Sequence, residues 1–210
     1  MSMPSAESAP FTLVVPVKTL THAKSRLGGF PDDIRRDLVQ AFALDTLTAA
    51  VASPLVARVA VVTDEPELAD RVRALGCDVL PDEGEGDLNA ALRAAVRTVD
   101  GPVATMLGDL PCLVPDDLTT ALSLVTGRCF VADAAGSGTT LLAAPVATDL
   151  DPRFGHGSRA AHRASGATEV TAAVPTLRHD VDTIADLDAA RTLGLGAHTR
   201  EVLERPEPGT

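Results

Sequence analysis

Aspartates that follow predicted strands are the side chains of this sequence best placed to do chemistry. Asp109 comes after an apolar run and a glycine, and Asp180 and Asp182 stand two positions apart in a predicted extended segment. Residues i and i+2 of an extended segment point to the same side, so these two carboxylates can serve one site. Hard divalent cations such as Mg²⁺ prefer oxygen ligands and keep substrate phosphates in their shell. Asp109 and the pair are therefore candidate ligands of one or two ions held against a phosphate.

Each of these aspartates also has a purely structural interpretation. Asp109 is equally typical of a turn after a strand, because Gly-Asp turns are common. Asp182 stands where the last predicted helix needs an N-cap, and aspartate is a favoured N-cap residue. Asp64, which ends the second predicted strand, belongs to the same set of acids at strand ends. The sequence leaves both interpretations open.

Three basic residues within nine positions follow the first predicted strand, namely Lys18, Lys24 and Arg26. Ligands of open α/β sheets bind at the carboxyl ends of the strands, and clustered Lys and Arg pair with phosphate there. The loop contains neither a Walker A sequence nor a GxGxxG sequence, which disfavours a P-loop ATPase and a Rossmann dinucleotide site. The alternative is a solvated basic loop without a ligand.

A hydroxyl and a glycine-rich turn form a second candidate anion site. Thr140 lies in a predicted strand, and Gly155, Gly157 and Ser158 lead into a predicted helix. Exposed backbone N–H groups at a helix start bind anions, although this pattern alone has little specificity. No serine stands in a nucleophile-elbow sequence, and no cysteine has an activating neighbour in the sequence. Together these residues indicate phosphoryl or nucleotidyl transfer without a covalent nucleophile.

The composition limits the classes of partner. A net charge of −11 disfavours non-specific binding to nucleic acid, but it leaves room for a small anion at a local basic cluster. The three cysteines show neither CxxC nor zinc-like spacing, which indicates buried reduced thiols. The sequence shows no signal peptide and no apolar run long enough to span a bilayer. We therefore expect a cytoplasmic protein without a membrane or nucleic-acid partner.

The elements that must position these residues alternate along the chain. Apolar, β-branched runs predict strands at 11–17, 58–63, 77–80, 103–107, 129–133, 139–144 and 169–174. Helical spacing predicts helices at 32–52, 66–75, 88–99, 115–124, 159–164 and 183–193. This order predicts a single three-layer α/β domain built on a mostly parallel mixed sheet. The domain is expected over residues 11–195, between a disordered lead at 1–10 and a polar tail at 196–210.

The motifs, taken in order, resemble those of one family. They are Val15-Pro16-Val17-Lys18, Ala23-Lys24-Ser25-Arg26-Leu27, Val62-Thr63-Asp64, Gly86-Asp87-Leu88-Asn89, Gly108-Asp109-Leu110-Pro111, Phe154-Gly155-His156-Gly157-Ser158 and Asp180-Val181-Asp182-Thr183. The combination resembles the CofC/FbiD family, the guanylyltransferases of coenzyme F420 biosynthesis, across roughly residues 11–195. That family is similar in fold to MobA-like and sugar-1-phosphate nucleotidyltransferases, so the resemblance implies a GT-A-like nucleotidyltransferase fold. Those relatives carry a glycine-rich signature where this chain has its Lys/Arg loop, which favours the F420 branch.

The resemblance implies transfer of GMP from GTP to phosphoenolpyruvate, giving enolpyruvyl-diphospho-5'-guanosine and pyrophosphate. Mg²⁺ is the implied cofactor, as one or two ions, and the downstream transferase of the F420 pathway is an implied partner. The Ala- and Arg-rich, Lys-poor composition is typical of actinobacteria and favours phosphoenolpyruvate as the acceptor. The same chemistry on 2-phospho-L-lactate or 3-phosphoglycerate is an alternative. A non-catalytic nucleotide-binding module is the alternative from a different class.

The resemblance also implies roles for individual residues. It places Mg²⁺ on Asp109, Asp180 and Asp182, and phosphoenolpyruvate on Thr140, Gly155 and Ser158. It implies a GTP site lined by Pro16, Lys18, Lys24, Arg26, Asp64, Gly86, Asn89 and Gly108. Lys18, Lys24 and Arg26, with Asp109, are the implied catalytic residues, because the three cations offset charge on the α-phosphate and the leaving pyrophosphate. Asn89 or a nearby backbone group is expected to read the guanine edge.

Overall fold

The computed structural model describes residues 10–17 and 27–205 of the chain. The predicted lead, apart from its last residue, therefore lies outside the described residues. The predicted basic loop with Lys18, Lys24 and Arg26 lies outside them as well.

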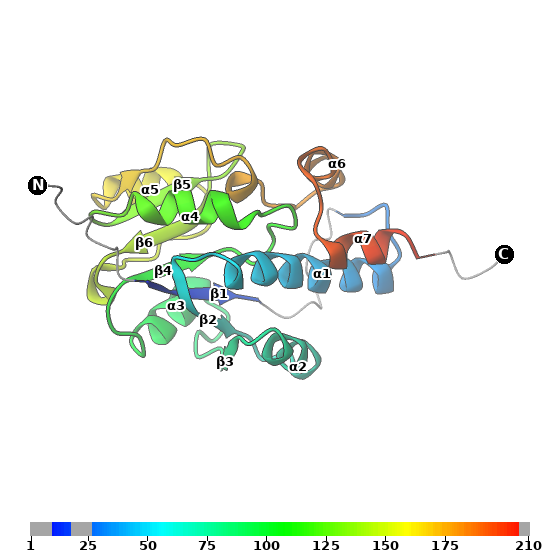
Figure 1. The fold of residues 1–210 in the computed structure, drawn as a ribbon, viewed down its shortest axis with the longest axis horizontal. Helices are drawn as coiled ribbons and strands as arrows, with labels where there is room; N and C mark the ends of the chain where they lie inside the picture. Colours follow the sequence, from blue (N-terminus) through cyan, green and yellow to red (C-terminus); the bar gives the residue numbers. More distant parts are fainter. Residues whose placement is uncertain (1–9, 18–26, 206–210) are drawn as a thin grey trace, which may run out of the picture.

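A seven-stranded mixed sheet forms the centre of the described chain, in the order β3-β2-β1-β4-β6-β5-β7 (Figure 1). Its strands are β1 Phe11–Pro16, β2 Val56–Val62, β3 Asp78–Leu80, β4 Val103–Met106, β5 Cys129–Ala132, β6 Thr139–Ala144 and β7 Thr168–Glu169. Strands β1 to β4 pair in parallel, whereas β6 is antiparallel to both of its neighbours, β4 and β5. The structure thus confirms a single α/β domain with a mostly parallel, mixed sheet.

The helices follow the predicted pattern, with shorter ends in several places. They are α1 Asp32–Val51, α2 Pro66–Ala74, α3 Leu88–Val96, α4 Pro115–Ser123, α5 Ser158–Ala164, α6 Ile184–Leu193 and α7 Ala197–Leu203, with 3₁₀ turns η2 Ala147–Asp149 and η3 Thr176–Arg178. Helices α2 and α4 begin with proline, whose fixed φ and missing N–H suit the first turn.

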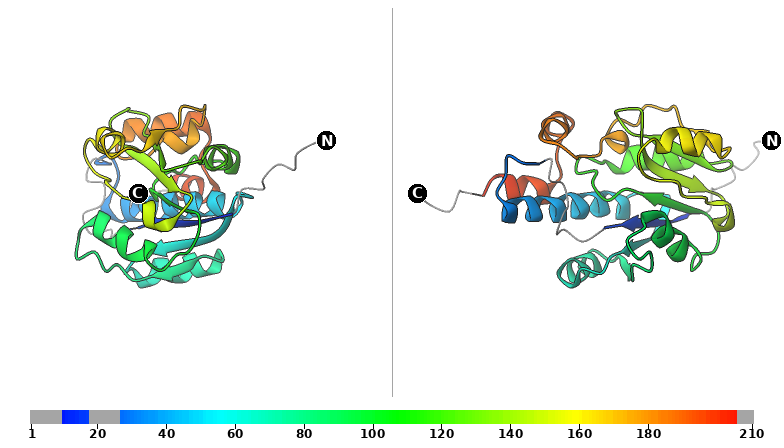
Figure 2. Two further views of the ribbon diagram at one scale, coloured as in Figure 1. Left: turned by 90° about the vertical axis from the view of Figure 1, so that its left-hand side faces the viewer. Right: turned by 180° about the vertical axis from the view of Figure 1, so that it is seen from behind.

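Two apolar layers cover the sheet, because successive strand residues point to opposite faces. Leu13 and Val15 of β1 pack with residues of α1, α2 and α4. Val14, between them, packs on the other face with residues of α3 and with Phe130 and Phe154. A third cluster joins the first half of α1 to α6 and α7, which lie beside it in Figures 1 and 2.

Two predicted elements differ in the structure. Residues 197–203 form helix α7, where a polar tail was expected from residue 196. The predicted strand at 169–174 is reduced to the two residues of β7. Beyond it, the carbonyl oxygens of Val170 and Ala172 accept hydrogen bonds from the Arg178 guanidinium (2.7 and 3.2 Å). Arg178 thus occupies acceptors that a longer strand would offer to a neighbour.

A buried carboxylate explains why the chain folds back as α7. Asp45, in the middle of α1, is 6% exposed and accepts the backbone N–H groups of His198 and Thr199, both at 2.9 Å. These are first-turn amides that lack partners within their own helix. Gly196 makes the approach possible, since a Cβ at this position would lie 2.2 Å from the Asp45 carboxyl carbon. Composition could not reveal this contact, because its partner lies far back along the chain.

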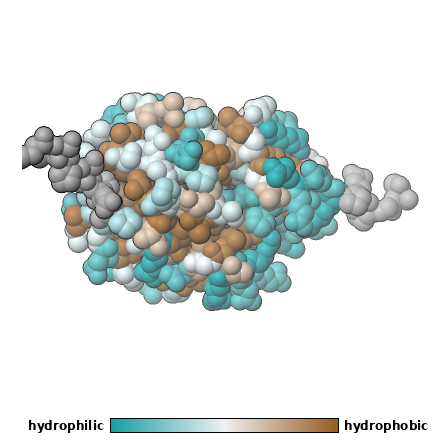
Figure 3. All heavy atoms as spheres, viewed as in Figure 1, coloured by the Kyte–Doolittle hydropathy of each residue, from teal (hydrophilic) through white to brown (hydrophobic). Residues whose placement is uncertain are grey.

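The molecular surface mixes hydrophilic and hydrophobic residues, and the end near α7 is the most hydrophilic on the face drawn in Figure 3. The large hydrophobic side chains that are exposed come from scattered positions: Val51, Val114, Leu124, Val146, Ile184 and Leu193. Within the part of the chain that the structure describes, no helix combines the length and the apolar character needed to cross a membrane.

We expect Asp45→Ala to lower the free energy of unfolding by roughly 2–4 kcal/mol, because two first-turn amides of α7 lose their acceptor. Urea denaturation followed by circular dichroism measures the change. Asp37→Ala is the matched control, since Asp37 lies on the same helix in an exposed ion pair with Arg205. The control should cost less than about 1 kcal/mol. Equal losses in the two variants would contradict the capping role of Asp45.

Candidate active site

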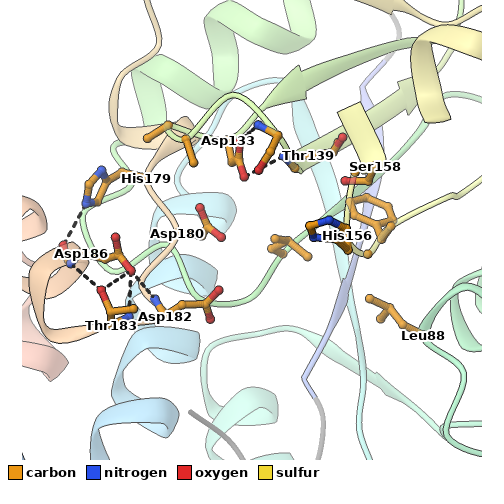
Figure 4. A pocket seen from close by; sticks show the side chains of 18 residues that line it. Leu88, Asp133, Thr139, His156, Ser158, His179, Asp180, Asp182, Thr183 and Asp186 are labelled. Carbon is orange, nitrogen blue, oxygen red and sulfur yellow. Dashed lines mark hydrogen bonds between the residues drawn. The ribbon is translucent and has the colours of Figure 1, made fainter. Parts of the chain in front are cut away.

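A cavity of about 570 Å³ opens beyond the end of β4. Its walls come from three segments, 133–139, 154–158 and 179–186, together with Leu88 and Leu107 (Figure 4). The volume falls within the range of ligand pockets, about 300–1,000 Å³. The position agrees with the rule that open α/β sheets bind ligands at the carboxyl ends of their strands.

Two of the three candidate metal ligands, Asp180 and Asp182, line this cavity, and Asp109 lies near Asp180. The Val181 N–H donates a 3.0 Å hydrogen bond to the Asp109 carbonyl, which joins the turn after β4 to the segment before α6. Val181 itself is fully buried, and the aspartates on either side of it, Asp180 and Asp182, line the cavity. Figure 4 shows both side chains directed into the same space. The i, i+2 relation read from the sequence thus holds in the structure.

Asp182 is not the N-cap of α6, which was its structural alternative. The N-cap of α6 is Thr183, whose hydroxyl accepts the backbone N–H of Asp186 at 3.2 Å. The Asp186 carboxylate in turn accepts the Thr183 N–H at 2.8 Å and completes a capping box. Asp182 precedes the cap and is therefore not needed to start the helix.

Like charges crowd around Asp180. Burial, together with the nearby carboxylates of Asp109, Asp182 and Asp133, raises the pKa of Asp180 to about 7. Asp133 comes from the loop between β5 and β6, where its carboxylate accepts the N–H groups of Ser137 and Gly138, both at 2.8 Å. Four carboxylates from three segments therefore share one electrostatic environment.

The oxygen donors of this cluster fit a hard divalent cation in their chemistry, because a cation would offset the repulsion between the neighbouring carboxylates. Within the described ranges, no three His, Cys, Asp or Glu side chains form a ready-made metal site. Binding of an ion would therefore require adjustment of these side chains. The metal assignment of Asp109, Asp180 and Asp182 stays a prediction.

Thr140 occupies an irregularity of the sheet, next to the cavity-lining residue Thr139. The β5–β6 pairing shifts there, since Val131 pairs with Leu141 and Ala132 with Thr139, which leaves Thr140 as an extra residue. Such bulges redirect side chains and are common beside active sites. The Thr140 Oγ1 atom is buried and has no hydrogen-bond partner in the described structure. Thr139, which sequence reasoning passed over, is the threonine that lines the cavity.

The glycine-rich segment forms the opposite wall, which we call the acceptor loop (residues 154–158). Gly155 and Gly157 have φ of +127° and +71°, conformations that side chains other than glycine rarely adopt. Ser158, the first residue of α5, is buried and donates its N–H to the Gly155 carbonyl at 3.1 Å. Gly155, Gly157 and Ser158 all line the cavity.

The residues expected at the GTP site lie at neighbouring strand ends. Pro16 ends β1, Asp64 follows β2 and Gly108 follows β4. A Cβ on Gly108 would lie 3.2 Å from the Pro16 carbonyl oxygen, so glycine lets these two strand ends approach closely. Gly86 precedes α3 with φ of +94°. How Lys18, Lys24 and Arg26 relate to this edge stays a prediction, since they lie outside the described residues.

Asn89, by contrast, does not present its amide to open solvent. Its Oδ1 atom accepts the Phe154 N–H at 2.7 Å, and its Nδ2 group donates to the Phe154 carbonyl at 2.9 Å. The expectation that Asn89 reads the guanine edge therefore conflicts with the engagement of both amide atoms by the acceptor loop.

His162 is a further residue that the sequence did not point out. It is fully buried, and its Nε2 atom accepts the Arg153 N–H at 3.0 Å. The neutral ring then carries its proton on Nδ1, which donates to Thr139 Oγ1 at 2.9 Å. The ring also packs edge-on against Phe154. His162 thus contacts both the bulged strand β6, through Thr139, and the acceptor loop, through Phe154.

Comparison with known proteins decides the family. The model of a family described as "Guanylyl transferase CofC like" matches residues 11–205. The chain belongs to this CofC-like family. A Streptomyces coelicolor protein named phosphoenolpyruvate guanylyltransferase is 50% identical to it over 204 residues, which cover 93% of this chain and 96% of that protein. A Salinispora arenicola protein of the same name is 47% identical, with 90% and 91% covered.

Solved structures place the CofC-like fold in a wider group. A nucleotide-diphospho-sugar transferase described as putative, from Desulfovibrio desulfuricans, superposes with a TM-score of 0.69 at 17% identity and covers 93% of this chain and 94% of that chain. A nucleotidyl transferase from Methanothermobacter superposes with a TM-score of 0.62 at 16% identity, covering 88% and 97%. At these identities the likeness concerns the fold alone, and it confirms the nucleotidyltransferase fold expected from the sequence.

The buried His162 predicts a pH dependence of stability. Burial lowers its pKa from 6.5 to about 4, so the folded protein keeps the ring neutral where the unfolded chain already takes up a proton. The stability that the protein gains from a neutral His162 ring is fully present above pH 6.5 and is lost as the pH falls toward 4. Between pH 7 and pH 5, wild-type protein should lose about 2 kcal/mol more unfolding free energy than His162→Gln. Parallel pH profiles in urea denaturation would contradict this, and an NMR titration of the ring provides the independent check.

Proposed function

We propose that this protein is a phosphoenolpyruvate guanylyltransferase, which transfers GMP from GTP to phosphoenolpyruvate and releases pyrophosphate. Identity of 50% to a relative of that name, over more than nine tenths of both chains, is the observation that carries the proposal. The structure supports it with a cavity that joins an acidic edge to a glycine-rich loop at the end of β4.

The reaction requires little covalent participation by the protein. A phosphate oxygen of phosphoenolpyruvate, already anionic, attacks the α-phosphorus of GTP in line with the leaving group. One P–O bond forms to the acceptor and the bond to the β-phosphate bridging oxygen breaks, so pyrophosphate departs with its electron pair. No proton has to be removed, and no general base is needed. Catalysis is therefore positioning and offset of charge.

The acceptor is assigned to Thr140, Gly155 and Ser158. The buried Thr140 Oγ1 lacks a protein partner in the described structure, which supports a hydrogen bond to a ligand. Gly155 and Ser158 lie on the wall of the cavity, and Thr140 is the neighbour of its lining residue Thr139. GTP is assigned to the strand ends at Pro16, Asp64 and Gly108, to Gly86 before α3, and to Lys18, Lys24 and Arg26.

The acidic residues have a different task in this proposal. Asp109, Asp180 and Asp182 would hold Mg²⁺, which supplies positive charge to the phosphates of GTP when bound. Lys18, Lys24 and Arg26 would add further positive charge for the phosphates. We also propose that the protein acts in the cytoplasm and passes its diphosphate product to a downstream transferase. Three buried free thiols, Cys77, Cys112 and Cys129, agree with a reducing compartment.

The direct test measures pyrophosphate release from GTP and Mg²⁺ with one acceptor per reaction: phosphoenolpyruvate, 2-phospho-L-lactate or 3-phosphoglycerate. We expect release with phosphoenolpyruvate and its loss on addition of EDTA. Release with phospholactate alone would retain the chemistry and overturn the acceptor. Silence with all three acceptors, even with a downstream transferase present to remove product, would overturn the function.

The metal assignment is tested by Asp182→Asn. The substitution keeps the size of the side chain but removes a charge from the acidic edge, so we expect loss of at least about 100-fold in kcat. Asp188→Asn is the matched control, because Asp188 lies on α6 in an exposed pair with Arg191 and away from the cavity. Circular dichroism should show both variants folded. Full activity of Asp182→Asn would contradict the assignment of Asp182 as a metal ligand.

A further inference from the structure

The side chain of Asn89 forms a two-point contact with the backbone of the acceptor loop. Both polar atoms of its amide are used, Oδ1 by the Phe154 N–H and Nδ2 by the Phe154 carbonyl. The contact spans 65 positions of sequence and pairs the second residue of α3 with the residue that precedes Gly155. A primary amide matches a peptide group in this way because each offers one donor and one acceptor side by side.

The segment just before Phe154 is fixed by two neighbouring contacts. Arg93, one turn further along α3, donates to the Pro152 carbonyl at 3.4 Å, and the Arg153 N–H donates to His162. The chain then enters Gly155, whose φ of +127° is a conformation that other residues rarely adopt. The Asn89 contact thus lies directly before the glycines of the acceptor loop.

Asn89 is itself held by a series of hydrogen bonds that begins at the end of β2. Asp64 accepts the Asp82 N–H at 3.0 Å, and Asp82 accepts the Gly84 N–H at 2.8 Å. The Gly84 carbonyl accepts the Asp87 N–H at 2.8 Å, and Asp87 caps α3 by accepting the Asn89 N–H at 2.7 Å. Every bond in the series involves a backbone group. The series therefore fixes the position of the acceptor loop relative to the end of β2, which is assigned to GTP.

We propose that Asn89 is a positioning residue for the acceptor, which holds the acceptor loop at the correct distance from the nucleotide, and that it does not read the guanine base. The inference rests on the proposed function, since it names the substrate whose binding Asn89 controls. A base edge would have to displace two backbone hydrogen bonds to reach the amide. Loss of those bonds leaves Gly155 to Ser158 without their anchor and weakens binding of the phosphorylated acid.

The test compares Asn89→Ala and Asn89→Asp with wild-type protein. Alanine removes both hydrogen bonds, whereas aspartate keeps the acceptor for the Phe154 N–H and places a repelling oxygen against the Phe154 carbonyl. In both variants we expect the KM for phosphoenolpyruvate to rise about tenfold or more, with the KM for GTP and the preference for GTP over ITP changed less than about twofold. Arg97→Ala, an exposed position at the end of the same helix, is the control and should match wild type.

A second readout does not depend on turnover. Hydrogen exchange measured by mass spectrometry should show faster exchange of peptide 152–158 in Asn89→Ala, and wild-type rates in Arg97→Ala. A relaxed preference for GTP over ITP with an unchanged KM for the acceptor would overturn the proposal, as would unchanged exchange in peptide 152–158. Wild-type protein that releases no pyrophosphate would overturn the proposed function instead, and the exchange measurement would still decide whether Asn89 anchors the loop.

Discussion

One backbone hydrogen bond, from the Val181 N–H to the Asp109 carbonyl, holds together the two segments that carry Asp109, Asp180 and Asp182. It joins the turn after a central strand to a segment that the chain reaches only near its end. Burial of the Val181 side chain against the third apolar cluster leaves the segment a single orientation, with its two flanking aspartates toward the cavity. Burial of Val181 and its backbone hydrogen bond thus position Asp180 and Asp182, although neither contact involves the aspartate side chains.

The concentration of negative charge has an energetic cost that the fold must carry. Burial raises the pKa of Asp180 to about 7, and the other carboxylates that the folded chain brings close to it add to the shift. Apolar packing on both faces of the sheet offsets this cost in stability. Residues at functional sites often oppose folding in this way.

Much of the architecture could be predicted from local pattern. Apolar, β-branched runs predict the strands, proline predicts two helix starts, and the spacing of Asp180 and Asp182 predicts their common orientation. The contacts that escaped prediction all join distant parts of the chain: Asp45 with α7, Asn89 with Phe154, and His162 with Thr139. Asp182 and Thr183 illustrate a second limit, because both residue types are good N-caps and only the folded chain shows which one serves.

The approach to the acceptor loop is fixed by hydrogen bonds to peptide groups. Pro152, Arg153 and Phe154 contribute only backbone atoms to the hydrogen bonds that fix the approach to Gly155. Within the loop, the buried Phe154 ring and the positive φ of Gly155 and Gly157 set the course of the chain, whereas His156 is exposed and does not. Under the proposed function, His156, which is exposed on the cavity wall, is a position where substitution can alter the choice of small acid while the path of the chain stays the same. The loop then offers a defined place to redirect that preference by design.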